Sequence, residues 1–208
     1  MLSFMDSTVR FFLAFLRSPL QVSAVMPTSE ATARCVCSKI PFDGTRKVII
    51  EYGPGTGITA KTLLRYFPLT ADSRVILIEK EPEFAETLRR EIEDLRVTIV
   101  CGSAEDVESI LHSCGETEAD AVLSSIPLSI MPSKIRDNIL AGTERILRDD
   151  GVFLVFLYRT VVQRHLRKFF PHVSVERVWR NVPPILVFAS RKTAVRRQDV
   201  MVSPSTCR

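Results

Sequence analysis

The feature that most constrains the fold is a set of three glycines at every second position, directly after a short apolar segment. The segment V-I-I-E-Y-G-P-G-T-G-I-T-A-K begins at Val48 and places Gly53, Gly55 and Gly57 between a predicted buried strand and a predicted helix. Bare backbone at a helix N-terminus lets a ligand lie directly on the main chain. The spacing G-x-G-x-G departs from the dinucleotide fingerprint G-x-G-x-x-G, because Ile58 stands where that pattern needs its third glycine. The segment indicates either a ligand-binding loop or a tight strand-to-helix turn without a ligand.

Strand-like and helix-like segments alternate along the rest of the chain. The predicted strands cover residues 48–52, 74–80, 97–101, 120–125, 151–158, 173–178 and 185–190, and the predicted helices cover residues 60–67, 82–95, 104–113, 133–148 and 161–170. Nearly continuous apolar strands separated by helices indicate a parallel sheet with helices on both faces. Residues 181–184 are too few for a crossover, so the last two strands are expected to pair antiparallel. We therefore predict an α/β fold with a seven-stranded, mostly parallel Rossmann-like sheet and an antiparallel C-terminal hairpin.

Charge is distributed unevenly along the 208 residues. Residues 1–40 carry a net charge of +2, residues 41–156 carry −7 and residues 157–208 carry +9. Two basic ends around an acidic middle suit an anionic partner, either a lipid head-group layer or a nucleic acid, although solvated helix faces give the same pattern. No apolar run approaches the roughly 18 residues of a membrane span, and the five cysteines lack metal-ligand spacing. We predict neither a transmembrane segment nor a metal.

Three further segments follow predicted strands at the same edge of the sheet. Glu79 ends the second strand, where a carboxylate can accept both hydroxyl groups of a ribose. The turn Gly102–Glu105 follows the third strand and is able to border an adenine. The segment S-S-I-P-L, residues 124–128, follows the fourth strand. The carboxyl ends of parallel strands form the edge at which ligands bind, so these segments are candidates for one site.

Together these segments resemble the class I S-adenosylmethionine-dependent methyltransferases over roughly residues 45–192. The E-x-G-x-G-x-G segment, the acidic strand tip and the turn after the third strand follow one another in that family's order, and the antiparallel hairpin also matches it. The resemblance implies S-adenosylmethionine as cofactor. It implies that the cofactor contacts come from Glu51, Gly53, Gly55, Gly57, Glu79, Ser103, Ala104, Glu105 and Ser124. Relatives often carry Asp at the position of Ser103.

The segment after the fourth strand distinguishes between methyl acceptors. In rRNA adenine dimethylases it reads N-L-P-Y or N-P-P-Y, with an amide that grips the adenine and an aromatic ring that stacks on it. Here Ser125 and Leu128 stand at those two positions, which argues against adenine. The segment S-S-I-P-L-S-I-M-P is instead similar to the S-G-L-P-type motif of the bacterial phosphatidylethanolamine N-methyltransferases. F-L-R-S-P-L-Q-V-S-A-V-M-P-T-S, residues 15–29, resembles the N-terminal segment of the same family.

That second resemblance implies N-methylation of phosphatidylethanolamine, towards phosphatidylcholine. The acceptor side would then be bordered by Ile126, Pro127 and Leu128, and the residues placed in catalysis are Ser124, Ser125 and Tyr158. The proton acceptor stays open among Tyr52, Tyr158, His165 and His172. Methylation of another acceptor, with rRNA adenine first, is the alternative function. A membrane-associated protein that binds S-adenosylmethionine without catalysis is the third.

Two basic segments are candidates for contact with an anionic membrane surface. Near the N-terminus a helical projection puts Phe11 and Phe15 on one face and Arg10 and Arg17 on the other, which suits either an interfacial helix or a helix packed on the domain. The second group of cations consists of Arg159, Arg164, Arg167 and Lys168. The predicted organisation is an amphipathic helix and cofactor lid at 1–44, a methyltransferase domain at 45–192 and a flexible tail at 193–208. The predicted location is the cytoplasm, at the inner face of the cell membrane.

Overall fold

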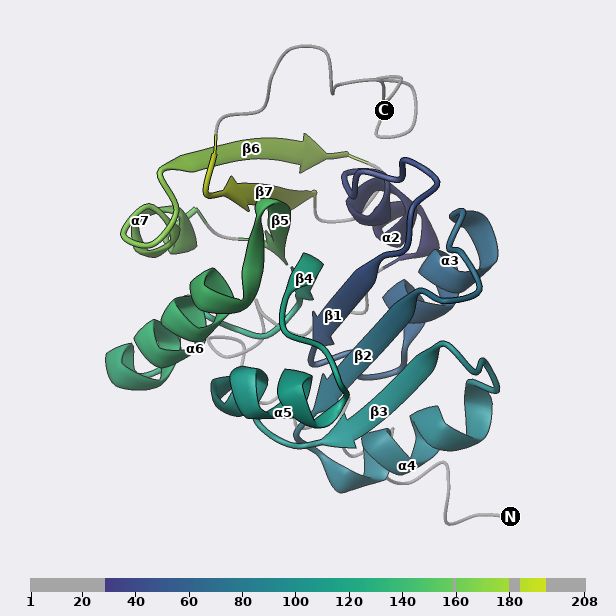
Figure 1. Ribbon diagram of the computed structural model, residues 1–208. Helices are drawn as coiled ribbons and strands as arrows, with labels where there is room; N and C mark the ends of the chain where they lie inside the picture. Colours follow the sequence, from purple (N-terminus) through teal and green to yellow (C-terminus); the bar gives the residue numbers. More distant parts are fainter. Residues whose placement is uncertain (1–28, 159, 180–183, 194–208) are drawn as a thin grey trace, which may run out of the picture.

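The computed structural model describes residues 29–158, 160–179 and 184–193, and they form one seven-stranded sheet with helices on both faces (Figure 1). The strands are β1 (Val48–Tyr52), β2 (Arg74–Glu79), β3 (Val97–Cys101), β4 (Ala119–Ser124), β5 (Leu147–Leu157), β6 (His172–Val178) and β7 (Ile185–Arg191). Their order in the sheet is β3-β2-β1-β4-β5-β7-β6. The pairs among β1 to β5 are parallel, and β7 is antiparallel to both β5 and β6. The predicted fold class, including the antiparallel hairpin, is confirmed.

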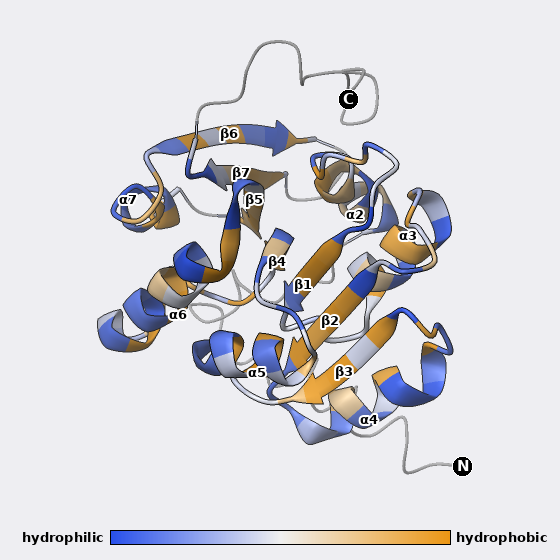
Figure 2. Cartoon of the chain, viewed as in Figure 1, coloured by the Kyte–Doolittle hydropathy of each residue, from blue (hydrophilic) through white to orange (hydrophobic). Residues whose placement is uncertain are grey.

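Helices cover the two faces of the sheet in separate groups. They are α2 (Glu30–Cys37), α3 (Ile58–Tyr66), α4 (Pro82–Glu91), the 3-10 helix η2 (Ala104–Asp106), α5 (Val107–Ser113), α6 (Ser133–Ile146) and α7 (Val162–Leu166). One core joins α2, α3 and α4 to alternate strand residues such as Ile49 and Leu77, and the other joins α5, α6 and α7 to residues such as Ile50 and Ile78. Side chains alternate between the two faces along a strand, and both faces are covered here. Residues of both faces are therefore buried, and β1 and β2 are apolar along most of their length (Figure 2).

Several element boundaries differ from the sequence-based expectation. Helix α4 ends at Glu91 rather than at residue 95, because Ile92 has an extended backbone. Helix α6 ends at Ile146, and β5 begins at Leu147 rather than at residue 151, because Leu147 already pairs with Ala119 of β4. Helix α7 covers only five residues of the predicted 161–170. Long-range strand pairing set the β5 boundary, and local periodicity does not show it.

Helix α2 was not predicted. Its N-cap is Ser29, whose side chain accepts a hydrogen bond from the backbone N–H of Thr32 at 3.2 Å. The Ser-Glu pair at residues 29–30 is an ordinary helix-start signal that the sequence carried. The helix buries Val36 and Cys37 in the core shared with α3 and α4. Residues 30–37 therefore pack with the sheet rather than apart from it.

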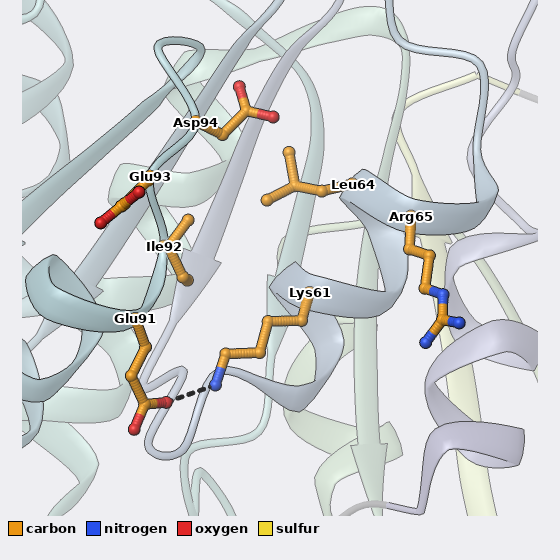
Figure 3. Close-up of a pocket in the computed structure, with 7 residues that line it drawn as sticks. All are labelled: Lys61, Leu64, Arg65, Glu91, Ile92, Glu93 and Asp94. Carbon is orange, nitrogen blue, oxygen red and sulfur yellow. Dashed lines mark hydrogen bonds and ion pairs between the residues drawn. The ribbon is translucent and has the colours of Figure 1, made fainter.

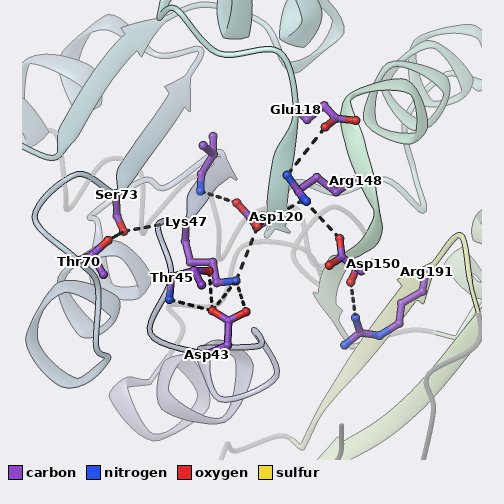
Figure 4. A network of polar contacts seen from close by, with 11 residues as sticks. Asp43, Thr45, Lys47, Thr70, Ser73, Glu118, Asp120, Arg148, Asp150 and Arg191 are labelled. Atoms are coloured by element: carbon purple, nitrogen blue, oxygen red, sulfur yellow. Dashed lines mark hydrogen bonds and ion pairs between the residues drawn. The ribbon is translucent and has the colours of Figure 1, made fainter.

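A polar network fixes the strand starts at the amino edge of the sheet (Figure 4). Lys47 is buried and pairs with Asp43 at 3.0 Å and with Asp120 at 3.8 Å. The other carboxylate oxygen of Asp120 accepts the backbone N–H of Val48 at 2.7 Å, and Arg148 approaches Asp120 to 3.7 Å. The network ties the starts of β1, β4 and β5 to one another. Charge at this edge is compensated within the described part of the chain.

Some predicted features lie outside the described residues. They are the N-terminal amphipathic helix with Arg10 and Arg17, Arg159, and residues 194–208 of the predicted tail. In the described part of the chain no helix is long and apolar enough to cross a bilayer.

Candidate cofactor site

The glycine loop between β1 and α3 requires glycine for two separate reasons. Gly53, Gly55 and Gly57 all have positive φ, of 63°, 55° and 75°, where other residues are strained. In addition, for two of the three, a Cβ would meet a neighbour: on Gly53 it would lie 2.6 Å from Cγ2 of Ile126, and on Gly57 2.6 Å from a methyl group of Leu88. The loop backbone therefore lies directly against the segment after β4 and against α4.

A hollow of about 170 Å³ opens between this loop, the ends of β2 and β3, and α6. It is lined by Gly53, Ile78, Glu79, Lys80, Gly102, Ser103, Ala104, Glu105, Ile126, Met131, Ile135 and Ile139. The tertiary structure thus gathers six of the predicted site residues from four separate segments. The hydroxyl of Ser103 accepts the backbone N–H of Glu105 at 3.2 Å, which fixes the turn at the start of η2.

Two buried carboxyl groups, Glu51 and Glu79, lie near the glycine loop without an ion pair among the described residues. Glu79 accepts the backbone N–H of Gly55 and that of Glu81, each at 3.0 Å, and lines the hollow. Glu51 is 3% exposed, and burial raises the pKa of its carboxyl to about 8, against a lowering hydrogen bond with Thr59 and with a smaller raising effect from Glu79. Among the described residues neither carboxylate forms an ion pair. A cationic ligand would offset the cost of burying them.

The segment after β4 closes the hollow on its other side. The hydroxyl of Ser125 donates to the backbone carbonyl of Gly53 at 2.8 Å, which holds the segment against the glycine loop. The hydroxyl of Ser124 is fully buried and has no hydrogen-bond partner in the described part of the chain. Ile126 lines the hollow and Pro127 is half-buried beside it, whereas Leu128 is fully buried in the core under α6. We therefore do not retain Leu128 as an acceptor contact.

Comparison with known proteins assigns the family. Residues 49–151 match the methyltransferase domain family. The ornithine lipid N-methyltransferase of Singulisphaera acidiphila is 31% identical over 180 residues, which cover 84% of this chain and 92% of that protein. The chain belongs to the class I S-adenosylmethionine-dependent methyltransferases.

Solved structures of methyltransferases share the fold. The precorrin-6y C5,15-methyltransferase of Geobacter metallireducens has a TM-score of 0.62 at 16% identity, over 80% of this chain and 90% of that one. The human methyltransferase-like protein 13, solved in complex with S-adenosylhomocysteine, has a TM-score of 0.59 at 18% identity, over 84% and 86% of the two chains. At these identities the likeness supports the architecture of the methyltransferase and not its acceptor.

Two observations on the methyltransferase fit S-adenosylmethionine. This cofactor carries a sulfonium and an ammonium group. Glu79 supplies a carboxylate at the hollow, and Glu51, which holds a proton in the ligand-free protein below pH 8, can ionise when a cationic ligand binds. The oxygens of Glu79 each hold one backbone hydrogen bond and keep acceptor capacity for ribose hydroxyl groups. Apolar side chains of α6 and the turn at Ser103 border the same hollow, as an adenine requires.

The remaining candidates for a proton acceptor occupy different places. The phenol of Tyr52 is fully buried, shares a hydrogen bond of 3.0 Å with Thr143 and has its pKa raised by burial, so its candidacy as a base is wrong. His172 is exposed at the start of β6, at the opposite edge of the sheet. His165 is buried on α7, where desolvation and then the charge of Arg136 lower its pKa. Tyr158 is half-buried at the carboxyl tip of β5, outside the hollow's lining.

A larger hollow of about 310 Å³ lies between α3 and the end of α4 (Figure 3). Its walls are mostly charged, and Lys61 spans it to pair with Glu91 at 2.6 Å. The same ammonium group donates to the carbonyl of Thr56 at 3.1 Å. Lys61 and Glu91 compensate each other, and no glycine of the loop lines this hollow, so we assign it no part in catalysis.

Sequence reasoning missed the wall that α6 contributes. Met131, Ile135 and Ile139 follow one another at intervals of four and all line the hollow. The interval is visible in the sequence as one apolar stripe at the start of a helix. Only the packing of α6 against α5, η2 and β5 decides that part of this stripe faces the hollow rather than the core.

Proposed function

We propose that this methyltransferase transfers methyl groups from S-adenosylmethionine to the amine of a membrane-lipid head group. The observation that carries the proposal is its 31% identity with an ornithine lipid N-methyltransferase over 84% of this chain and 92% of that protein. The resemblance of residues 15–29 and 124–132 to phosphatidylethanolamine N-methyltransferases points to the same class of acceptor. Phosphatidylethanolamine and ornithine lipids both present a primary amine, so these two are the head groups to compare.

The composition of the site supports a small head group over a nucleic-acid base. None of the described residues that line the hollow is aromatic, and the proposed acceptor segment, Ser125–Pro127, contributes Ile126 to that lining. An extruded adenine would find among these described residues no stacking partner, which is worth roughly 1–3 kcal/mol. An aliphatic amine requires space and alignment but no stacking ring.

In the proposed mechanism the chain mainly binds and aligns. The bound cofactor supplies a methyl group already activated by its positive sulfur. Gly53 and Gly55 would let the loop backbone lie close to it, Glu79 would accept hydrogen bonds from its ribose hydroxyl groups, and Glu51 would balance its positive charge. Ser125 holds the acceptor segment against Gly53.

The acceptor amine must be neutral when it attacks, so its proton leaves before or during transfer. We propose Tyr158 and the hydroxyl groups of Ser124 and Ser125 as the groups of the chain that receive or orient this proton, with water as the alternative. Contact with lipid phosphates is proposed for the exposed cations of α7 and of the turn directly after it, which are Arg164, Arg167 and Lys168 and are called here the cations of α7. This proposal places the protein on the cytoplasmic face of a membrane.

The test uses methyl-labelled S-adenosylmethionine with detergent micelles that contain one lipid each. We expect label in the chloroform phase with phosphatidylethanolamine or ornithine lipid. Phosphatidylcholine is the matched control, because its quaternary nitrogen cannot accept a further methyl group. Label in added rRNA, or in none of these pools while the cofactor binds, would contradict the proposal and favour the adenine or the non-catalytic alternative.

A further inference from the structure

The outermost strand β6 carries an exposed stripe that the proposed function does not use. Val175, Arg177 and Trp179 alternate along the strand and its end, so they share one face. Val175 is 47% exposed and Trp179 is 62% exposed, whereas Val173 at the start of the same face packs against the core beside α7. The guanidinium of Arg177 lies 5.1 Å from the centre of the Trp179 ring. A large aromatic side chain and a cation are thus presented together on an edge strand.

The register places this stripe at the edge where the cofactor site lies. Val178 pairs with Ile185, and the next residue, Leu186, pairs with Leu157 at the carboxyl end of β5. Trp179 therefore stands just beyond the carboxyl edge that also carries the glycine loop. Two more exposed apolar residues follow the carboxyl ends of β4 and β5 and so lie at the same edge. They are Ile130, 46% exposed, and Val161, 50% exposed.

The segment that carries the stripe is rich in cations. Residues 160–179 contain four Lys or Arg and one carboxylate, Glu176. Glu176 points to the other face of β6, where it pairs with Lys39. The four cations are Arg164, Arg167, Lys168 and Arg177, and all are exposed without an ion pair among the described residues. The surface is therefore complementary to an anionic one.

We infer that the stripe Val175–Arg177–Trp179, with the cations of α7, is a contact surface for an anionic phospholipid bilayer. Tryptophan rings prefer the head-group level of a membrane, where the indole N–H stays hydrated and the ring is buried. Arg177 lies among phosphates in this arrangement, and the carboxyl edge of the sheet faces the lipid. The inference rests on the proposed function, because a lipid head group reaches the hollow only from a membrane that this edge faces.

Trp179 is the only tryptophan of the chain, so its fluorescence reports on this surface alone. We expect vesicles of phosphatidylglycerol and phosphatidylethanolamine to shift its emission to the blue and to remove most of its quenching by acrylamide. Phosphatidylcholine vesicles should diminish both effects, because they carry no net charge. High salt should do the same, because the Debye length shrinks to about 3 Å at 1 M salt. Unchanged emission with anionic vesicles would overturn the inference. So would protection of Trp179 that depends on protein concentration without vesicles, since that indicates a contact between copies of the chain.

Variants test the two components of the surface by co-sedimentation with the same vesicles. Trp179→Ala and Arg177→Gln should each weaken binding, the first by roughly tenfold and the second by about fivefold. Leu95→Ala is the matched control, because Leu95 is fully exposed but precedes β3 at the opposite edge of the sheet. Equal losses for Leu95→Ala and Trp179→Ala would overturn the assignment of this surface.

The micelle assay separates this inference from the proposed function. Trp179→Ala should methylate detergent-solubilised lipid at the wild-type rate and lose activity only on vesicles. If the wild type methylates no lipid in micelles, the proposed function fails, and vesicle binding by Trp179 still decides the inference. If Trp179→Ala loses activity equally in micelles and on vesicles, Trp179 does not act through the bilayer and the inference fails.

Discussion

Charged side chains pair with one another at the amino edge of the sheet, whereas the buried carboxyl groups at the carboxyl edge have no such partner. At the amino edge, Lys47, Asp120 and Arg148 satisfy one another and the backbone of Val48 (Figure 4). At the carboxyl edge, Glu51 and Glu79 are buried without a cation among the described residues. A compensated network stabilises the fold, whereas uncompensated carboxylates cost stability until a ligand pairs with them. At the amino edge the protein supplies both charges of each pair, whereas at the carboxyl edge a ligand would supply the missing positive charge.

The glycines at the two edges also differ, in the space around the missing side chain. Gly44, in the loop before β1 at the amino edge, has a φ of 81° but open space around its missing side chain. Gly53 at the carboxyl edge has a φ of 63° and a neighbouring side chain in the place of its Cβ. Gly44 is needed only for the positive φ of its turn, whereas Gly53 is also needed because the loop lies directly against Ile126. Matched changes at the two edges can therefore separate stability from binding.

The largest effect is expected from adding one methyl group to the glycine loop. In Gly53→Ala the new Cβ would lie 2.6 Å from Ile126, so the loop or the segment after β4 must move. We expect the affinity for S-adenosylmethionine to fall at least about 100-fold, which corresponds to ~2.8 kcal/mol. Isothermal titration calorimetry measures the loss, and circular dichroism checks that the variant folds.

Gly44→Ala is the control for this change. It introduces the same strain at positive φ with nothing within 4 Å, so it should cost about 1 kcal/mol of stability and leave cofactor affinity unchanged. If both variants weakened binding equally, global stability rather than local geometry would explain the loss, and the contrast between the edges would break.

The second effect compares one carboxylate from each edge. Glu79→Gln removes the negative charge beside the hollow and one of the two hydrogen-bond acceptors of that side chain, so cofactor affinity should fall roughly 30-fold, equivalent to about 2 kcal/mol. Asp120→Asn should instead lower the free energy of unfolding by about 1–3 kcal/mol with affinity preserved, because it breaks the network of Lys47 and Arg148. Chemical denaturation and calorimetry together give both numbers. A loss of stability in Glu79→Gln with unaltered affinity would contradict the assignment.

The third effect is a pH dependence that the amino edge does not share. Because the pKa of Glu51 is raised from 4.5 to about 8, the folded, ligand-free protein holds this proton over a range where the unfolded chain has lost it. The stability from this group is therefore complete below pH 4.5 and is lost as the pH rises through 8. A cationic cofactor favours the ionised form, so its affinity should rise about tenfold between pH 6 and 8 and then level off.

Calorimetry in buffers of different ionisation enthalpy would detect the proton that binding releases below pH 8. Glu51→Gln has no such proton, so its affinity should be lower and flat over the same range. A rise of equal size in Glu51→Gln would assign the titration to another group.

The smallest effect compares two hydroxyl groups. The hydroxyl of Ser125 donates to Gly53 at 2.8 Å, and Ser125→Ala should reduce turnover by about threefold to tenfold, since one neutral hydrogen bond contributes about 1 kcal/mol. Ser73 accepts the backbone N–H of Lys47 at 3.1 Å at the amino edge, so Ser73→Ala should lower the melting temperature and leave turnover unchanged. Radiometric assays and thermal melts distinguish the two. Equal activity in both variants would show that Ser125 has no positioning role.

Sequence patterns determined much of this protein. The apolar strand pattern fixed a mostly parallel sheet, the four-residue link fixed the antiparallel hairpin, and Gly53 and Glu79 indicated the cofactor edge. These inferences hold because they depend on local chemistry: a strand buried on both faces must be apolar, and positive φ with close packing requires glycine. The cap at Ser29 was equally local, and α2 could have been predicted from it.

Only the tertiary structure decided which side chains face the ligand. Ile126 and Leu128 are two residues apart in one loop and similar in chemistry, yet the first lines the hollow and the second is buried in the core. Tyr52, adjacent to the glycine loop in sequence, points into the core towards Thr143. Trp179 reaches the cofactor edge only through the register of β6, β7 and β5. The physical reason is that residue type sets what a side chain can do, whereas strand register and loop path set what it meets.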